Sequence, residues 1–270
     1  MKELIELRKL SQNLVFTEHN HSYINVNTKK RYLSVSALKK AVSQPFDDEY
    51  WTMYKALQAS GFIVKFIPGN QEKRLINVNG SNVRLDVLKT YDLTTTPLDL
   101  KKAWDEEAIK GKTRGSELHL VYEQYKQRKV TDQKFYKTAE KVKQSDRYVV
   151  AQEIIVADDE LMIAGTIDEI EINSNLDWFL EDLKTDKEIK TSNKFQKFKE
   201  PLSHLEDCNF NTYVVQLNLY AYIVEKNTSI RFKGFNINHL SEDGIVKYSV
   251  PRLNLTDEIV RRIIDLAKSN

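Results

Sequence analysis

The sequence of 270 residues contains little cysteine, glycine and proline, and it has no long apolar run. The single cysteine, Cys208, excludes a disulfide within the chain and any metal site built from several cysteines. With only 8 glycines and 5 prolines, the chain has no low-complexity linker. No apolar stretch approaches the roughly 20 residues that a membrane-spanning helix needs. We therefore expect a globular, cytoplasmic protein with no membrane partner.

Acidic and basic residues are separated along the chain, although the formal net charge is only +2. Ten acidic residues and no lysine or arginine lie between Ala151 and Leu183, whereas six lysines lie between Lys184 and Lys199. An acidic block can concentrate a cation, and a basic block can hold a polyanion such as nucleic acid. The alternative is that both blocks are solvated faces of strands and a helix.

The strongest β pattern covers residues 148–185, where turn signals at Asp158-Asp159 and Ser174-Asn175 separate three apolar runs. This spacing predicts an antiparallel meander. A buried helix is predicted over residues 211–225, two further strands over 230–240 and 244–250, and a C-terminal amphipathic helix capped by Thr256. The sum is an α/β (α+β) fold, in which helices flank a central mixed sheet that contains the meander.

The N-terminal half predicts shorter elements. Residues 15–36 are typical of a hairpin, with Ser36 as the cap of a following helix. Asn79-Gly80 is a hairpin turn signal inside a predicted β insertion over residues 61–96. Pro97 begins another helix, and Ser116 is predicted to cap a separate helix that starts at the next residue.

Two aspartates and a lysine form the candidate centre. On a strand that ends at residues 181–184, Asp182 and Lys184 point to the same face, and Glu181 points to the other. Asp168 lies on the preceding strand, and Glu153, one strand earlier, can line the site from the side or lie in solvent. Carboxylate oxygens suit Mg²⁺ or Mn²⁺. The alternative is that both aspartates form turn hydrogen bonds and that the lysine lies on the surface.

Three further side chains are candidates. His119 is predicted near the N-terminal end of its helix, either as a metal ligand or as an ordinary helix-end histidine. Gln216 and Tyr220 are four residues apart, so they share one face of the apolar helix. They form either part of the site or a buried structural hydrogen-bonded pair.

Four short motifs occur in the order of a known nuclease family. They are Gly115–His119 (Gly-Ser-x-x-His), Gly165–Asp168 (Gly-x-x-Asp), Asp182–Lys184 (Asp-x-Lys) and Gln216–Tyr220 (Gln-x-x-x-Tyr). In this order they resemble the RecB-like branch of the PD-(D/E)XK nuclease superfamily. The lead-in that includes Pro45-Phe46-Asp47 is similar to that of phage-encoded relatives of the mitochondrial genome maintenance exonuclease. Serine replaces the usual threonine in the first motif, and the four cysteines of the iron–sulfur subgroup are absent.

The resemblance implies a restriction-endonuclease-like core and roles for its motif residues. Mg²⁺ or Mn²⁺ would be bound by His119, Asp168, Asp182 and the backbone carbonyl of Leu183. Lys184 would position or activate the attacking water. The resemblance also implies that Gln216 and Tyr220 brace the site and contact the DNA backbone.

Basic and aromatic residues that follow the Asp-x-Lys motif are candidates for the DNA path, because lysines hold phosphates and aromatic rings stack on bases. They are Lys187, Lys190, Lys194, Phe195 and Lys197. The basic segment Lys126–Lys143 is a second candidate. Surface solvation is the alternative for both.

We therefore predict a metal-dependent DNA nuclease, an exonuclease acting on single-stranded DNA or DNA ends in replication, recombination or repair. It would act in the bacterial host cell if phage-encoded, with replication or recombination proteins as further partners. The expected single domain, 1–270, comprises a lead-in (1–60), the insertion (61–96), a catalytic core (97–250) and a C-terminal helix (251–270). The alternatives are a non-cleaving DNA-binding or accessory module, a restriction-type endonuclease and an unrelated α/β scaffold.

Overall fold

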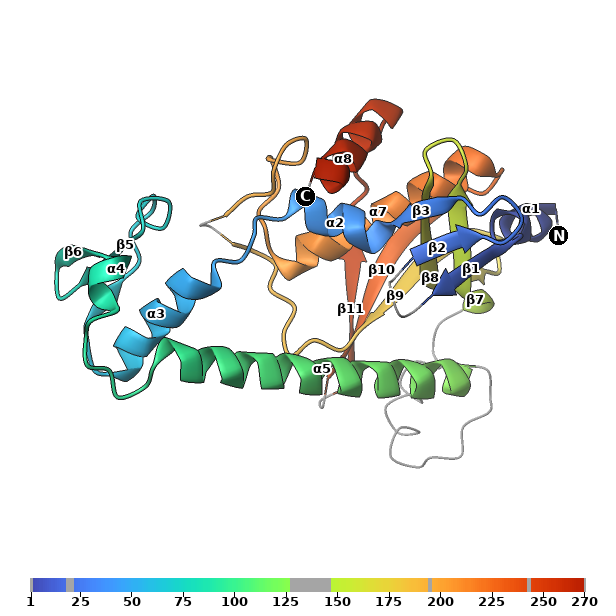
Figure 1. Ribbon diagram of the computed structural model, residues 1–270. Coiled ribbons are helices and arrows are strands. Elements are labelled where there is room, and N and C mark those ends of the chain that lie inside the picture. Colours follow the sequence, from blue (N-terminus) through green and yellow to red (C-terminus); the bar gives the residue numbers. More distant parts are fainter. Residues whose placement is uncertain (1, 18–21, 127–146, 194–195, 242–243, 270) are drawn as a thin grey trace. The chain divides into compact units, whose positions relative to one another are not determined.

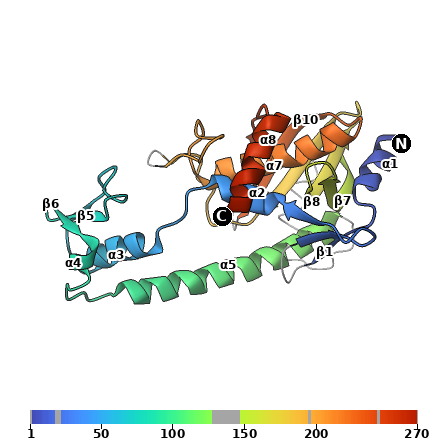
Figure 2. The same ribbon diagram turned by 45° about the horizontal axis from the view of Figure 1, so that its top comes forward.

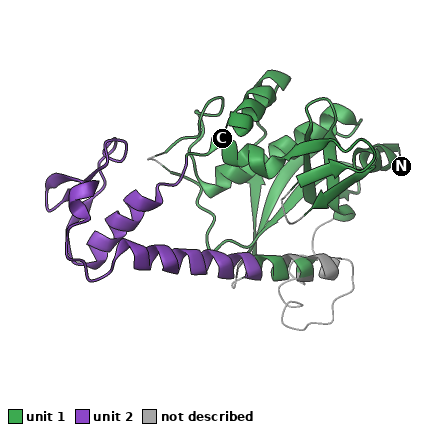
Figure 3. Cartoon of the chain, viewed as in Figure 1, with its two compact units in different colours: residues 1–44, 115–270 green, residues 45–114 purple. Residues whose placement is uncertain are grey.

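The chain has a mixed α+β fold and divides into two compact units. The computed structural model describes residues 2–17, 22–126, 147–193, 196–241 and 244–269. The first unit comprises Met1–Gln44 and Gly115–Asn270, and the second comprises Pro45–Arg114 (Figure 3). The described residues contain seven helices, none of them long and apolar enough to span a membrane.

The first unit is built on an eight-stranded mixed sheet with the order β1-β2-β3-β8-β9-β10-β11, in which β7 also pairs with β8. Two neighbouring pairs, β3 with β8 and β9 with β10, are parallel, and the others are antiparallel. The strands are β1 (Leu14–Thr17), β2 (Ser22–Asn25), β3 (Arg31–Ser34), β7 (Arg147–Asp158), β8 (Ile163–Asn173), β9 (Trp178–Lys184), β10 (Phe232–Ser241) and β11 (Gly244–Val250). The predicted meander is confirmed as β7-β8-β9.

One part of β8 lies where its neighbours separate. On the edge opposite β7, β8 pairs with β3 through Ile163 and Ala164 and with β9 through residues 169–172. The stretch between these pairings holds the Gly165–Asp168 motif. At this point the Leu183 backbone N–H of β9 donates to the Asp168 side chain, at 2.9 Å.

Helix α7 (Asn209–Asn227) supplies the centre of the hydrophobic core, which its buried residues share with strands β8, β9 and β10. Helix α2 (Val35–Val42) packs against α7 and α8 (Asp257–Ser269), and α1 (Lys2–Leu10) packs against α7 and β7 (Figures 1 and 2). The predicted apolar and C-terminal helices are both confirmed, as is the Thr256 cap, whose hydroxyl accepts a hydrogen bond from Ile259 N–H at 3.3 Å.

Two predicted helix starts are wrong. The cap of α2 is Ser34 rather than Ser36, because Ser34 has an extended backbone and its hydroxyl accepts the Ala37 N–H at 3.0 Å. Ser116 caps no helix, because it lies inside the continuous helix α5 (Pro97–Lys126). Extending a formed helix adds a hydrogen bond per residue, whereas restarting one requires a new nucleus.

The second unit has a small core of its own. It contains α3 (Asp48–Ala59), α4 (Leu85–Leu88) and a three-stranded antiparallel sheet of β4 (Val64–Lys65), β5 (Leu75–Val78) and β6 (Ser81–Arg84). The predicted hairpin turn is confirmed, since Asn79 and Gly80 connect β5 to β6 with φ values of 49° and 87°. This unit extends beyond the predicted insertion at both ends, because its core also uses Tyr50, Met53 and Leu57 of α3.

Candidate active site

Asp168 and Asp182 lie on adjacent strands, at the point where β8 and β9 separate. Their strands pair up to Glu169 and Glu181. Beyond that pair, a carboxylate oxygen of Asp168 accepts the Leu183 N–H in place of a strand partner. The arrangement turns one aspartate toward the backbone of the strand that carries the other.

Asp182 is almost completely buried, with 1% of its surface exposed. Its Oδ1 accepts a hydrogen bond from Gln216 Nε2 at 3.2 Å, and its Oδ2 forms a close ion pair with the Lys184 ammonium. Burial raises the pKa of Asp182 to about 6; the Lys184 ammonium opposes this rise, and the negative charge of Asp168 adds to it. A buried carboxylate with so few donors is costly, and a bound cation would offset that cost.

Lys184 follows Asp182 on the same face of β9, and its side chain is 16% exposed. Burial lowers the pKa of Lys184, but the negative charges of Asp182 and Asp168 outweigh burial and raise it overall. The ammonium group also donates to the Leu183 carbonyl at 3.3 Å and lies 4.9 Å from the centroid of the Tyr213 ring. Lys184 is therefore a fixed positive charge beside the two carboxylates.

Gln216 and Tyr220 brace Asp182 from α7. Gln216 donates to Asp182 and, at 3.3 Å, to the Tyr220 hydroxyl, and the two side chains are only 6% and 4% exposed. The Tyr220 ring packs directly on Gly165, where an added Cβ would lie 2.5 Å from the ring and 3.1 Å from Val35. Because Gly165 of the Gly-x-x-Asp motif has no side chain, the Tyr220 ring can pack against it. Burial favours bracing over a contact with the DNA backbone.

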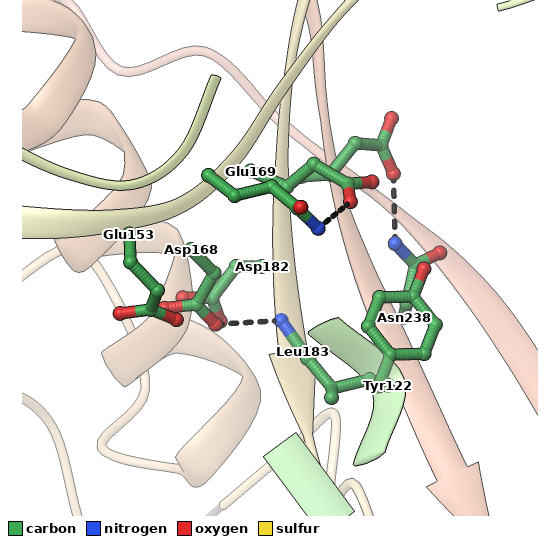
Figure 4. Close-up of a pocket in the computed structure, with 9 residues that line it drawn as sticks. Tyr122, Glu153, Asp168, Glu169, Asp182, Leu183 and Asn238 are labelled. Atoms are coloured by element: carbon green, nitrogen blue, oxygen red, sulfur yellow. Dashed lines mark hydrogen bonds between the residues drawn. The ribbon is translucent and has the colours of Figure 1, made fainter. Parts of the chain in front are cut away.

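A small pocket opens beside the two aspartates, lined by Asp168, Asp182, Leu183, Glu153 and Tyr122 among others (Figure 4). Its volume is about 10 Å³, which is the space of about one water molecule or ion. Glu153 lies between Gln152 and Ile154, which pair with the two neighbours of Asp168 on β8, and it has a φ of 45°, in the left-handed region that glutamate rarely adopts. Such backbone strain concentrates at functional sites.

The described residues offer Mg²⁺ or Mn²⁺ only a few protein ligands, and this number suits these ions. No group of three or more His, Cys, Asp and Glu side chains within the described residues could hold a metal ion. Mg²⁺, however, usually keeps several waters and is held by one or two carboxylates together with substrate phosphates. The two neighbouring carboxylates fit this chemistry, since the partners of Asp182 among the described residues are one amide donor and the Lys184 ammonium. Asp168, Asp182 and the Leu183 carbonyl are the candidate ligands.

His119 does not lie near a helix start. The predicted position depended on Ser116 as a cap, and both residues lie well inside α5. The side chain of His119 lies outside the described part of the chain, so its role as a ligand stays a prediction. Gly115 has a packing role, since an added Cβ would lie 2.9 Å from the hydroxyl of Thr185, the residue after Lys184.

Glu181 has the separate environment that strand alternation predicts. Its carboxylate, also 1% exposed, accepts hydrogen bonds from Asn236 Nδ2 and Arg147 at 2.6 Å each and from Asn238 Nδ2 at 3.0 Å. Lys247 Nζ lies 2.9 Å from Glu181 Oε2, the oxygen that also accepts the hydrogen bond from Asn238. Although Glu181 lines the same pocket, its donors already satisfy it.

The candidate DNA-path residues lie in the long connection between β9 and α7. Lys187, Lys190 and Lys197 are exposed there, which a phosphate contact requires. Lys194 and Phe195 lie outside the described residues, as does most of the predicted basic segment Lys126–Lys143.

Sequence reasoning missed Lys39 of α2. Its ammonium group donates to Gln216 Oε1 and lies 5.5 Å from the centroid of the Tyr213 ring. Burial, together with the positive charge of Lys184, lowers the pKa of Lys39 to about 8. One local signal could have identified Lys39. It lies four residues after the buried Val35, so a charged side chain falls on the apolar face of the helix.

Comparisons with known proteins leave the family open. No protein-family model matches the chain, and no curated protein matches it. Among solved structures it is similar to one described as the crystal structure of SSO0001, with 13% sequence identity, coverage of 99% of this chain and 84% of that chain, and a TM-score of 0.36. A similarity of this size carries no argument, so the assignment below depends on the residues themselves.

Proposed function

We propose that this protein is a metal-dependent DNA nuclease of the RecB-like type. The observation that carries the proposal is Asp182, a buried carboxylate between a second aspartate and a lysine, with only one amide donor and the Lys184 ammonium as its partners among the described residues. A stabilising core has no need of such a costly arrangement, whereas a hydrolytic site uses carboxylates to bind a cation and a lysine to act on water or phosphate.

Each residue has a role that follows from its contacts. Asp168, Asp182 and the Leu183 carbonyl would hold Mg²⁺ or Mn²⁺, which when bound polarises a phosphoryl oxygen and lowers the pKa of a coordinated water. Lys184 orients the attacking water or stabilises the negative charge that develops on the phosphate. Gln216 keeps Asp182 in place through its Nε2 hydrogen bond.

DNA, single-stranded or with free ends, is the proposed substrate. The exposed Lys187, Lys190 and Lys197 follow β9 directly, so they can bind phosphates of a strand whose scissile bond lies at Lys184. The four motifs in family order support DNA as the polymer and cleavage from an end.

The test is cleavage of end-labelled single- and double-stranded DNA with Mg²⁺, with Mn²⁺ and with EDTA. We expect metal-dependent shortening that falls on the order of 10²–10³-fold in Lys184→Ala. Lys268→Ala, which removes the same charge from an exposed position of α8, is the matched control and should cleave like the wild type. The direction of the product ladder assigns polarity.

Two results would overturn the proposal. Cleavage that persists in Lys184→Ala would mean that another site, or a contaminating nuclease, is responsible. DNA binding without cleavage under every metal condition would favour the non-cleaving module instead.

A further inference from the structure

We propose that Lys39 is a second phosphate-binding residue of the active site, which contacts a backbone phosphate of the DNA strand next to the bond that is cut. The inference rests on the proposed nuclease function and extends it to a residue outside all four motifs. It is carried by the position of Lys39 relative to Asp182, Lys184 and the basic connection between β9 and α7.

The first observation is a chain of hydrogen bonds that joins Lys39 to the candidate metal ligand. Lys39 Nζ donates to Gln216 Oε1, and Gln216 Nε2 donates to Asp182 Oδ1 at 3.2 Å. Lys39 is thus one side chain removed from Asp182, although it comes from a different helix. A neutral donor could bond Gln216 equally well, so this bond alone does not explain a positive charge.

The second observation is the pairing of two ammonium groups around one ring. Lys39 and Lys184 lie 5.5 Å and 4.9 Å from the centroid of Tyr213, whose hydroxyl donates to Asp186 at 2.7 Å. The positive charge of Lys184 acts on Lys39, and a phosphate close to both ammonium groups would interact favourably with each of them. Polyanion binding gives both charges a function.

The third observation is the charge balance of the site. The groups that act electrostatically on Lys39 are Lys184, Asp182, Asp168 and Asp186. With Lys39 included, two lysines face three aspartates, so the cluster carries one net negative charge when all are ionised. Glu153 lines the same pocket and adds one more negative charge, so a bound divalent cation would bring the site to neutrality, whereas without Lys39 the site would stay negative and repel a phosphodiester.

The fourth observation is that α2 adjoins the basic connection. The Lys199 N–H donates to the Val42 carbonyl at 2.7 Å, and Gln44 Nε2 donates to the Lys197 carbonyl at 3.1 Å. The C-terminal end of α2 and the segment with Lys197 therefore form one surface. Lys39, a partly exposed residue of α2, thus connects the candidate metal site, through Gln216, with the segment that carries Lys197.

The experiment compares Lys39→Met, Lys39→Arg and the control Lys40→Met, which removes an exposed charge from the next position of the same helix. Binding of a single-stranded oligonucleotide is measured in Ca²⁺ over a series of salt concentrations, and cleavage is measured in Mg²⁺. Losing one phosphate contact should reduce the slope of log K against log salt by about 0.7. We expect this reduction in Lys39→Met, with cleavage at low DNA concentration about 10- to 100-fold lower.

Lys39→Arg should retain the slope, and Lys40→Met should match the wild type in both measurements. An unchanged slope in Lys39→Met would overturn the inference and assign Lys39 to holding Gln216 alone. Equal losses in Lys39→Met and Lys40→Met would also overturn it, because they would reflect the general charge of α2. A melting curve for each variant shows that it is folded.

The outcome is separable from the proposed function. If the wild type binds DNA but does not cleave it, the nuclease proposal fails while the salt slope still tests Lys39. If the wild type cleaves and Lys39→Met keeps both its slope and its rate, only the Lys39 inference fails. A wild type that does not bind DNA overturns both.

Discussion

Glu181 and Asp182 are neighbours on β9, and both carboxylates are 1% exposed, yet their environments differ. Glu181 has two amide donors, an arginine and a lysine around its two oxygens. Asp182 has only one amide donor and one lysine around its two oxygens. The two carboxylates are equally buried but differ in the number of donors around them, so burial alone does not distinguish the candidate metal ligand from its well-bonded neighbour.

The largest effect on stability is expected when the negative charge of Glu181 or of Asp182 is removed, one residue at a time. Glu181→Gln removes the buried carboxylate that Arg147 and Lys247 share and leaves Arg147 with the more distant Glu171, 3.9 Å away, so we expect a loss of about 3 kcal/mol in the free energy of unfolding. Asp182→Asn should instead abolish the rise in melting temperature that Mg²⁺ or Mn²⁺ produces, because a ligand that binds only the folded state stabilises it.

Thermal and urea unfolding of both variants, with and without metal, measure these effects. Glu181→Gln should keep the metal-induced rise, and Asp265→Asn, on an exposed position of α8, is the control for Asp182→Asn. A metal response that is lost in Glu181→Gln and kept in Asp182→Asn would reverse the comparison.

A smaller effect is expected at Gly165, which sharpens the comparison by disturbing only the support of Asp182. In Gly165→Ala the new Cβ would lie 2.5 Å from the Tyr220 ring, so the ring must shift and carry Gln216 with it. Overpacking of this kind costs about 1–3 kcal/mol of stability. Cleavage should fall as well, since Gln216 positions Asp182.

Gly111→Ala is the matched control, because nothing lies within 4 Å of a Cβ added there in α5. It should stabilise the chain by about 1 kcal/mol, since glycine is unfavourable inside a helix. Equal stability of the two variants in urea would contradict the packing assigned to Tyr220.

The smallest effect is expected at Asp158, a third buried carboxylate that resembles Glu181 in being well bonded. It accepts hydrogen bonds from Leu161 N–H at 2.7 Å and Asn227 Nδ2 at 3.1 Å, and Lys226 Nζ lies 3.1 Å away. Burial raises the pKa of Asp158, but these donors outweigh burial and lower it below its usual value of 3.8. A lowered pKa means that the stabilisation is present above pH 3.8 and is lost as the pH falls through the folded-state pKa.

Asp158→Asn should therefore be less stable than the wild type by about 1–2 kcal/mol at pH 7. The difference should shrink as the pH is lowered below 3.8. Urea unfolding at several pH values measures it. A difference that is constant with pH would show that hydrogen-bond geometry, and not ionisation, accounts for the stabilisation.

The sequence predicted the parts of the site that depend on local spacing. Asp182 and Lys184 share a face because strand side chains alternate, and Gln216 and Tyr220 meet because they are one helical turn apart. The meander was also predictable, since its three strands follow one another with turn residues between them. These relations need no knowledge of the rest of the chain.

The wrong predictions and the missed residue involve choices between local alternatives or contacts over long distances. Ser34 and Ser36 are both good caps, and the pairing of Ser34 with Ala164 of β8 leaves Ser34 extended and α2 beginning after it. Serine is a favourable helix cap, but Ser116 lies inside α5, and the helix continues through it.

By itself, the sequence determined the elements with a clear apolar period, the turn between β5 and β6, and the shared faces of Asp182 with Lys184 and of Gln216 with Tyr220. Only the tertiary structure decided that Lys39 meets Gln216, which is 177 residues away, and that the Gly165 position admits the Tyr220 ring. The physical reason is that local propensity acts over a few bonds, whereas a site is completed by close packing of segments far apart in the chain.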